Sequence, residues 1–134
     1  MHKYAYMQII GVGAMRYADA FKVLSDATRL RVLYVLLKAG KELCICELMD
    51  SLEVRHYNVS RCLKELRLAG LVKEKKEGRF VFYKINDIED KFLVMLYKLI
   101  FALPEKEFEE DLSRMKKRIS LRLKGRVVIT MRKK

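Results

Sequence analysis

The chain has 134 residues, of which 51% are hydrophobic and 34% are charged, as in a single soluble globular domain with one core. Its net charge of +12 is concentrated in residues 113–134, which hold ten basic side chains and no acidic one. Three cysteines are too few, and odd in number, for a disulfide framework, which excludes a disulfide-stapled scaffold and predicts a cytoplasmic protein.

The first half of the chain has the periodicity of helices. We expect residues 4–24 to be helical, and Ser25-Asp26 to cap a helix over 27–38 that Ala39-Gly40 ends. A short helix over 45–52, a turn near 53–56 and a helix over 57–69 follow, and Gly70 stops the last of these. These segments predict three helices in close succession, with a turn between the second and the third.

The period then changes to that of strands. Residues 71–77 and 79–85 are predicted to form a hairpin around Glu77-Gly78, because the second segment is rich in aromatic and β-branched side chains. Asn86-Asp87 is expected to cap an apolar helix over 88–103, which is too short to span a bilayer. Pro104 is expected to open a last helix, and 126–131 reads as a strand-like tail. This order predicts a mainly α fold with a small β-hairpin, a winged helix-turn-helix.

Three stretches resemble one known family. They are AFKVLSDATRLRVL over 20–33, VSRCLKELRLAGLV over 59–72 and EGRFVFY over 77–83. In this order they resemble the ArsR/SmtB family of metal-responsive repressors, over about residues 18–86. The resemblance implies a homodimer formed by the first helix and the 88–103 helix, bound to double-stranded operator DNA. It divides the chain into a DNA-binding and dimerisation domain, 1–104, and a C-terminal helical extension with a basic tail, 105–134.

The helix over 57–69 is the expected recognition helix. Asn58 and Arg61 are the best candidates for reading base edges in the major groove, while Ser60 and Lys64 suit phosphates. Further DNA-contact candidates are Tyr57 on the helix, Arg55 and His56 in the turn, and Arg79 after the wing turn, which resembles the residue that enters the minor groove in winged proteins. The competing interpretation is a solvated basic face, or a general nucleoid-type protein that binds all sequences alike.

Two thiols flank one isoleucine at Cys44-Ile45-Cys46. Residues i and i+2 of a regular helix point about 200° apart, so these cysteines could chelate one ion only where an extended segment meets a helix start. We therefore expect an extended Glu42-Leu43 and a helix that begins near Ile45. A helix N-terminus also lowers thiol pKa values. Soft sulfur ligands suit As(III), Sb(III), Cd(II), Zn(II) or Cu(I).

The segment ELCICEL, residues 42–48, resembles the arsenic-responsive branch of the family, in which a third cysteine follows three residues later. Met49 stands at that place here. As(III) prefers three thiolates but two can hold it, so we predict a repressor that arsenite or antimonite releases from DNA through Cys44 and Cys46. Cu(I), Cd(II) or thiol oxidation remain alternative signals. The remaining alternative is that Cys44 and Cys46 are inert structural cysteines that bind no inducer. Cys62 is expected to pack with Val59 and Leu66.

Other functions find less support in the sequence. No nucleophile–base pair and no complete phosphate-binding loop occurs, so we expect no enzyme and no required cofactor. A thiol enzyme that uses Cys44 and Cys46 in redox exchange is the weakest alternative. The helix over 88–103 has no histidine, so the zinc site that other family members carry there is not expected. The basic tail could be solvated, could attract phosphates, or could pack on a dimer partner through its apolar stripe, and we favour packing for Phe108–Leu123.

Overall fold

The computed structural model describes residues 13–122, with side chains described from residue 16. The beginning of the helix expected over 4–24, and the strand-like segment expected over 126–131, lie outside the described residues. The elements are α2 (Gly13–Val23), α3 (Ala27–Ala39), β1 (Leu43–Cys44), α4 (Ile45–Leu52), α5 (His56–Leu68), β2 (Val72–Glu77), β3 (Phe80–Ile85), α6 (Lys91–Phe101), the 3-10 turn η1 (Glu105–Phe108) and α7 (Glu109–Ile119).

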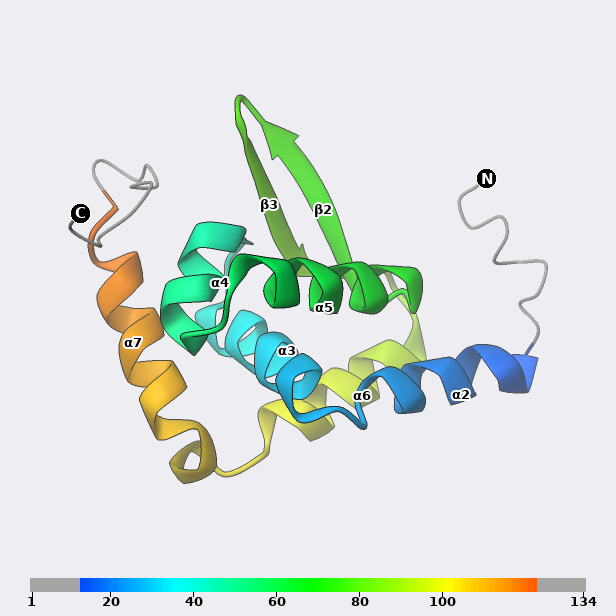
Figure 1. Cartoon of the computed structure of the whole chain (residues 1–134). Coiled ribbons are helices and arrows are strands. Elements are labelled where there is room, and N and C mark those ends of the chain that lie inside the picture. Colours follow the sequence, from blue (N-terminus) through cyan, green and yellow to red (C-terminus); the bar gives the residue numbers. More distant parts are fainter. Residues whose placement is uncertain (1–12, 123–134) are drawn as a thin grey trace.

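Helix α3 lies at the centre, with α4 and α5 on one side and α6 across it (Figure 1). The β2–β3 hairpin projects from this body as a wing, and α7 runs along α4 at the end remote from α2 (Figure 1). The three strands form an antiparallel sheet in the order β1-β3-β2, in which Leu43 lies opposite Tyr83. The mainly helical winged helix-turn-helix fold expected from the sequence is confirmed.

Most predicted ends agree with the structure because local signals set them. The Asp26 carboxylate accepts a hydrogen bond from the backbone N–H of Arg29, 3.0 Å away, and so caps α3. Gly40 ends the same helix in the left-handed region at φ 66°, which a residue without Cβ adopts at low cost. Helix α4 has the predicted bounds, and Gly78 turns the wing at φ 65°.

Two predicted helix starts were wrong. Helix α6 begins at Lys91 rather than 88, and its cap is Asp90, whose side chain accepts from the N–H of Leu93 at 3.1 Å. Asn86 does not cap it, because its side-chain amide donates to the carbonyl of Gly70, 2.9 Å away, and so ties the end of β3 to the end of α5. After Pro104 the chain first makes the 3-10 turn η1, and α7 starts only at Glu109.

The core joins all of these helices. Tyr34 is fully buried, donates its hydroxyl to the carbonyl of Leu103 at 3.0 Å, and stacks on Phe108 with ring centroids 3.9 Å apart. Leu112 and Met115 of α7 belong to the same cluster, so the apolar stripe of the C-terminal extension packs on the chain's own α3 and α4. Cys62 is buried with Val59 and Leu66, as expected. Among the described residues, no helix is long and apolar enough to cross a bilayer.

Candidate nucleic-acid interface and thiol site

Helices α4 and α5 form a helix-turn-helix. Glu53 ends α4 in the left-handed region at φ 56°, and Arg55 precedes α5 in an extended conformation. Val59, Leu63 and Leu66 bury one side of α5 against the body. The opposite side of α5 therefore faces outward, in the orientation that a recognition helix needs.

The structure gathers the predicted DNA-contact residues on this outward side and on the wing. Seven of the eight are exposed and Ser60 is half-buried; the exposed ones are Arg55, His56, Tyr57, Asn58, Arg61, Lys64 and Arg79. Tyr57 is 68% exposed, and the guanidinium carbon of Arg61 lies 5.5 Å from its ring centroid, a cation–π contact. This arrangement agrees with the predicted roles of these residues in DNA contact.

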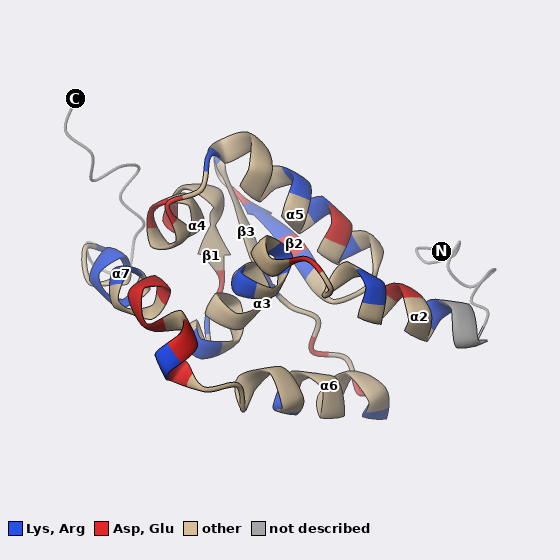
Figure 2. Ribbon diagram, turned by 60° about the horizontal axis from the view of Figure 1, so that its bottom comes forward, with Lys and Arg blue, Asp and Glu red and all other residues tan. Residues whose placement is uncertain are grey.

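The wing extends the basic surface. Arg79 follows Gly78 at the tip of the hairpin, and the blue ribbon segments in Figure 2 mark Lys and Arg positions along β2 and on α5. Some of these cations already hold acidic partners: Lys73 lies 2.8 Å from Asp87, and Arg67 lies 3.8 Å from Glu74. A contact with phosphates at these positions would therefore exchange an exposed ion pair, which is weak in water.

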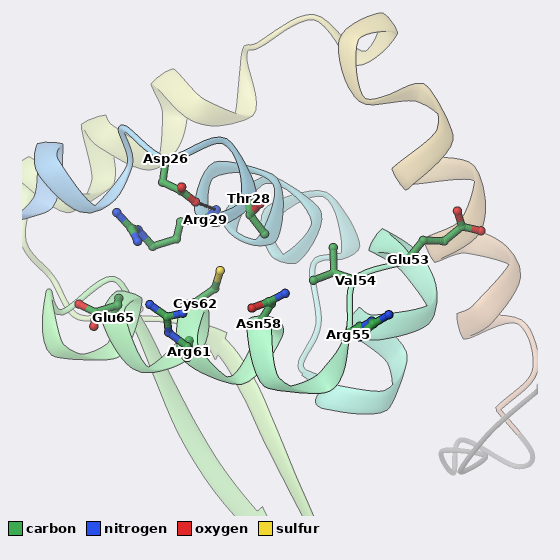
Figure 3. A pocket seen from close by; sticks show the side chains of 10 residues that line it. All are labelled: Asp26, Thr28, Arg29, Glu53, Val54, Arg55, Asn58, Arg61, Cys62 and Glu65. Carbon is green, nitrogen blue, oxygen red and sulfur yellow. Dashed lines mark hydrogen bonds between the residues drawn. The ribbon is translucent and has the colours of Figure 1, made fainter.

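A hollow of about 420 Å³ lies between the start of α3 and the first turns of α5 (Figure 3). Asp26, Arg29 and Thr28 line it from α3, and Asn58 and Arg61 line it from α5. The lining carries both signs of charge, since Glu53 and Glu65 also border it. The two predicted base-reading side chains thus border open space on one side, which leaves their rotamers room to adjust to a groove.

The two thiols lie where an extended segment meets the start of a helix, which is the geometry that two cysteines at i and i+2 need to bind one ion. Leu43-Cys44 is a short strand, Cys44 has extended dihedrals of φ −92° and ψ 169°, and α4 begins at Ile45. The two sulfur atoms consequently converge, with Sγ of Cys44 and Sγ of Cys46 2.8 Å apart. Glu47 closes half of a capping box, because its Oε1 accepts from the backbone N–H of Cys44 at 3.2 Å. Cys44 is buried and Cys46 is partly exposed.

The two thiols titrate as a pair. The Cys44 thiol donates to the Cys46 sulfur and the Arg118 guanidinium lies beside it, which lowers the pKa of Cys46 to about 7. The same shared hydrogen bond, together with burial, raises the pKa of Cys44 far above its ordinary value. Above about pH 7 the pair therefore holds one proton and one negative charge.

This asymmetry predicts the alkylation behaviour of the thiols. The rate at which iodoacetamide modifies Cys46, followed by peptide mass spectrometry, is expected to rise with pH to a midpoint near 7, because the thiolate is the nucleophile. Cys62, whose pKa is raised by burial, serves as an internal control that is still gaining reactivity well above that pH. In Cys44→Ala the Cys46 midpoint should move upward. A Cys46 midpoint at the unperturbed value of 9.0 would contradict the described pairing.

The basic residues after 113 include three that the sequence did not reveal as part of the site. Arg114, Arg118 and Arg122 are spaced four residues apart and point toward α4 rather than solvent. Arg114 Nε donates to the carbonyl of Ser51 at 2.8 Å, and Arg118 Nε donates to Asp50 Oδ2 at 2.8 Å. Arg122 forms a two-pronged pair with Glu47, at 2.7 Å and 2.6 Å. The spacing of four residues between these arginines indicates that they lie on one face of a helix. The spacing alone does not show against which other helix this face packs.

The donor set restricts which ions fit. Within residues 13–122, no group of three or more His, Cys, Asp or Glu side chains is arranged to hold a metal ion. Met49, at the place of the expected third cysteine, is half-buried on α4. The two converging thiols alone fit a thiophilic ion or metalloid that accepts two sulfur ligands.

The structure is that of a winged helix-turn-helix protein, because it combines a helix-turn-helix, an outward-facing second helix of that motif and a β-hairpin wing. The profile of the family described as "Bacterial regulatory protein, arsR family" matches residues 26–74. A cadmium resistance transcriptional regulatory protein, a CadC homolog of Staphylococcus aureus, is 40% identical over 80 residues, which cover 60% of this chain and 65% of that protein. The arsenic resistance transcriptional regulator ArsR2 of Pseudomonas putida is 41% identical over 68 residues, covering 51% and 58%. The chain thus spans less than two thirds of these two relatives.

A shorter relative is matched over most of its length. The uncharacterized HTH-type transcriptional regulator MJ1325 of Methanocaldococcus jannaschii is 38% identical over 79 residues, which cover 59% of this chain and 88% of that protein. Among solved structures, the AntR antimony-specific transcriptional repressor superposes with a TM-score of 0.56 at 27% identity, covering 72% of this chain and 83% of AntR. The chain belongs to the ArsR/SmtB family of helix-turn-helix regulators.

Proposed function

We propose that this chain is a homodimeric, DNA-binding transcriptional repressor that a soft metalloid, arsenite or antimonite, releases from its operator by binding to Cys44 and Cys46. The observation that carries the proposal is the convergence of the two sulfurs, 2.8 Å apart, at the first residues of α4. Helix α4 is the first helix of the helix-turn-helix, so a ligand on the thiols acts on the element that supports the recognition helix.

Exposed polar and basic side chains on α5 and the wing support the DNA-binding part. Asn58 and Arg61 are of the residue types that hydrogen-bond adenine and guanine edges, and both face outward. Half-buried Ser60, with Lys64 and Arg79, suits phosphates and a neighbouring minor groove. The chain belongs to a family of transcriptional regulators, which agrees with a role in DNA binding rather than catalysis.

The inducer is proposed from the chemistry of the thiols. Relatives at similar identity carry names that mention cadmium and arsenic, and the similar structure is named antimony-specific, so the names do not choose between ions. Two sulfurs with no third Cys or His beside them in the described part of the chain favour a trivalent metalloid over a four-coordinate ion. Cu(I), which two sulfurs also suit, Cd(II) and thiol oxidation are the alternatives that the experiment below separates.

Release needs an energetic link between the thiols and the DNA-reading face. Helix α4 is joined to α5 by the short turn 53–55, and β1, which ends at Cys44, pairs with β3 of the wing. Both DNA-contacting elements are therefore attached directly to the thiol-bearing segment. A tenfold loss of DNA affinity requires about 1.4 kcal/mol of coupling, and nearly complete release requires several times more.

The proposed homodimer would use the outer face of α2 and α6. Phe21, Met95 and Leu99 are 56%, 55% and 62% exposed, and Figure 2 shows few charged residues along α6. Contiguous exposed apolar side chains of this size mark an interaction surface. A twofold partner on this face would present two recognition helices to a pseudo-palindromic operator, at centres about one helical turn apart.

Changing Leu99 to Glu should separate the proposed dimer without unfolding the chain. Leu99 is largely exposed in the single chain, so the new charge costs little in the monomer but would be buried between two copies. We expect a shift from dimer to monomer in sedimentation velocity, with unchanged far-UV circular dichroism. Lys98→Glu, at the exposed neighbouring position of the same helix, is the matched control for an added negative charge. A dimer that survives Leu99→Glu would place the interface elsewhere.

The proposed function is tested with operator DNA selected from a random duplex library. Fluorescence anisotropy of the selected duplex and of a scrambled one is measured at a fixed salt concentration, with arsenite, antimonite, Cu(I), Cd(II) or hydrogen peroxide added in turn. We expect specific binding that arsenite or antimonite weakens in the wild type and leaves intact in Cys44→Ser/Cys46→Ser. Equal affinity for both duplexes would favour a nucleoid-type protein, and release of the double serine variant by arsenite would refute the thiol sensor.

We assign residues 1–104 to DNA binding and dimerisation in a cytoplasmic repressor, and residues 105–134 to a C-terminal extension. The described part of that extension packs against α4, the helix that carries Cys46.

A further inference from the structure

Helix α7 and the residues after it form a second wall of the thiol site. Arg118 is fully buried; its Nε donates to Asp50 Oδ2 at 2.8 Å, and its Nη2 lies 3.6 Å from the sulfur of Cys46. Arg122 holds both oxygens of Glu47, which is also fully buried, and donates to the carbonyl of Glu42 at 3.0 Å. A segment more than seventy residues away in sequence thus surrounds the thiols with two guanidinium groups.

These guanidinium groups engage the carboxylates nearest to the thiols. Glu47 and Asp50 lie within six residues of Cys44 on α4 and are of the type that completes the coordination of Cd(II) or Zn(II) when only two thiolates are present. Each is already paired with an arginine, at 2.6 Å for Arg122 and 2.8 Å for Arg118. To recruit either carboxylate, a cation would have to break a short charge-assisted pair in a poorly hydrated site.

The two guanidinium groups repel a cation but not a neutral hydroxide. A trivalent element E as E(OH)₃ condenses with the thiol pair: two E–O bonds break, two E–S bonds form, and two water molecules leave with two protons. Both protons come from the thiols or, where Cys46 is already a thiolate, one of them comes from solvent. The product keeps one hydroxyl and carries no charge, so it does not meet repulsion from the two guanidinium groups. Its oxygen is an acceptor for an N–H donor, and Arg118 Nη2 already lies against one of the sulfurs.

We propose that α7 is part of the inducer site, and that Arg118 and Arg122 make the thiol pair selective for a neutral trivalent hydroxide of arsenic or antimony over divalent soft cations. This rests on the proposed function, since it takes Cys44 and Cys46 as the inducer ligands. Arg118 sets the selectivity between the hydroxide and the cations. It pairs with the Asp50 carboxylate, and its Nη2 provides an N–H donor beside the Cys46 sulfur. Arg122 removes Glu47 as a ligand in the same way.

The experiment measures ion affinities of the full chain without DNA, by near-UV absorption of the sulfur–ligand bonds and by the shift in melting temperature. The probes are sodium arsenite and cadmium chloride. In Arg118→Gln, which removes the charged partner of Asp50 described above and the donor beside Cys46, the ratio of cadmium affinity to arsenite affinity is expected to rise at least tenfold. Arg114→Gln, in the same arginine row but bound to Ser51 and Asp111, is the matched control and should keep the wild-type ratio.

A second variant covers the case in which Arg118→Gln does not fold. Asp50→Asn/Arg118→Gln removes both charges of the pair together, and in it arsenite affinity should still fall about tenfold while cadmium gains little, because the carboxylate is gone. Ion affinities of both folded variants within twofold of the wild type would overturn the proposal. If Cys44→Ser/Cys46→Ser binds arsenite as the wild type does, the proposed function fails first, and this inference falls with it.

Discussion

Replacing Arg118 with alanine is expected to lower the free energy of unfolding by about 3–5 kcal/mol, as is usual when one partner of a buried ion pair is removed. The side chain is fully buried between α7 and α4, and Asp50, its partner at 2.8 Å, is only 11% exposed. The variant loses the pair and leaves a cavity between the two helices. Chemical denaturation followed by circular dichroism measures the change.

Two further variants separate the charge from the packing. Lys117→Ala, at an exposed neighbouring position of α7, should change the free energy of unfolding by less than about 0.5 kcal/mol. Asp50→Asn/Arg118→Met, which fills the same space without charge, should recover most of the lost stability, because both charges of the buried pair are removed together. If Arg118→Ala were as stable as Lys117→Ala, α7 would not be anchored on α4 through this pair.

The largest effect on DNA binding is expected from Asn58→Ala/Arg61→Ala. Each base-edge contact typically contributes about 1–3 kcal/mol, so the double variant should lose about 2–6 kcal/mol, or roughly 30-fold to 20,000-fold in affinity for the selected operator. Both side chains are exposed on α5 and border the hollow beside α3, so their removal should not affect folding. Anisotropy titrations of operator and scrambled duplex measure the loss.

Comparison with Lys64→Ala tests whether the loss concerns sequence recognition. Lys64 is expected to contact phosphate, so its removal should weaken operator and scrambled DNA alike and reduce the slope of log affinity against log salt by about one unit. Asn58→Ala/Arg61→Ala should instead weaken the operator selectively. An equal loss for both duplexes would reassign Asn58 and Arg61 to the phosphate backbone.

Much of the fold followed from signals within a few residues. Asp26 caps α3 and Gly40 and Gly78 adopt left-handed dihedrals, so helix and turn limits were set where these residues stand. The start of α6 was predicted wrongly, because a local cap signal at Asn86 could not show that its side chain binds Gly70, sixteen residues earlier. Such long-range hydrogen bonds override local preferences and leave no periodic trace.

The candidate site divides in the same way. The convergence of Cys44 and Cys46 could be predicted, because it depends only on where the extended segment ends and α4 begins. The involvement of Arg118 and Arg122 could not, since a run of basic residues near a terminus normally reads as a solvated surface. Their burial follows from the packing of Leu112 and Met115 on α3 and α4, which sets the rotation of α7 and directs the arginines inward.

The central claim is that the thiol pair and the DNA-reading face are energetically coupled, and a thermodynamic cycle tests it most directly. Arsenite affinity is measured for the free protein and for the operator complex, and operator affinity is measured with and without saturating arsenite. The account predicts that both ratios exceed ten and agree with each other, as linkage requires, and that both become one in Cys44→Ser/Cys46→Ser. Thiol-dependent arsenite binding with both ratios equal to one in the wild type would contradict it.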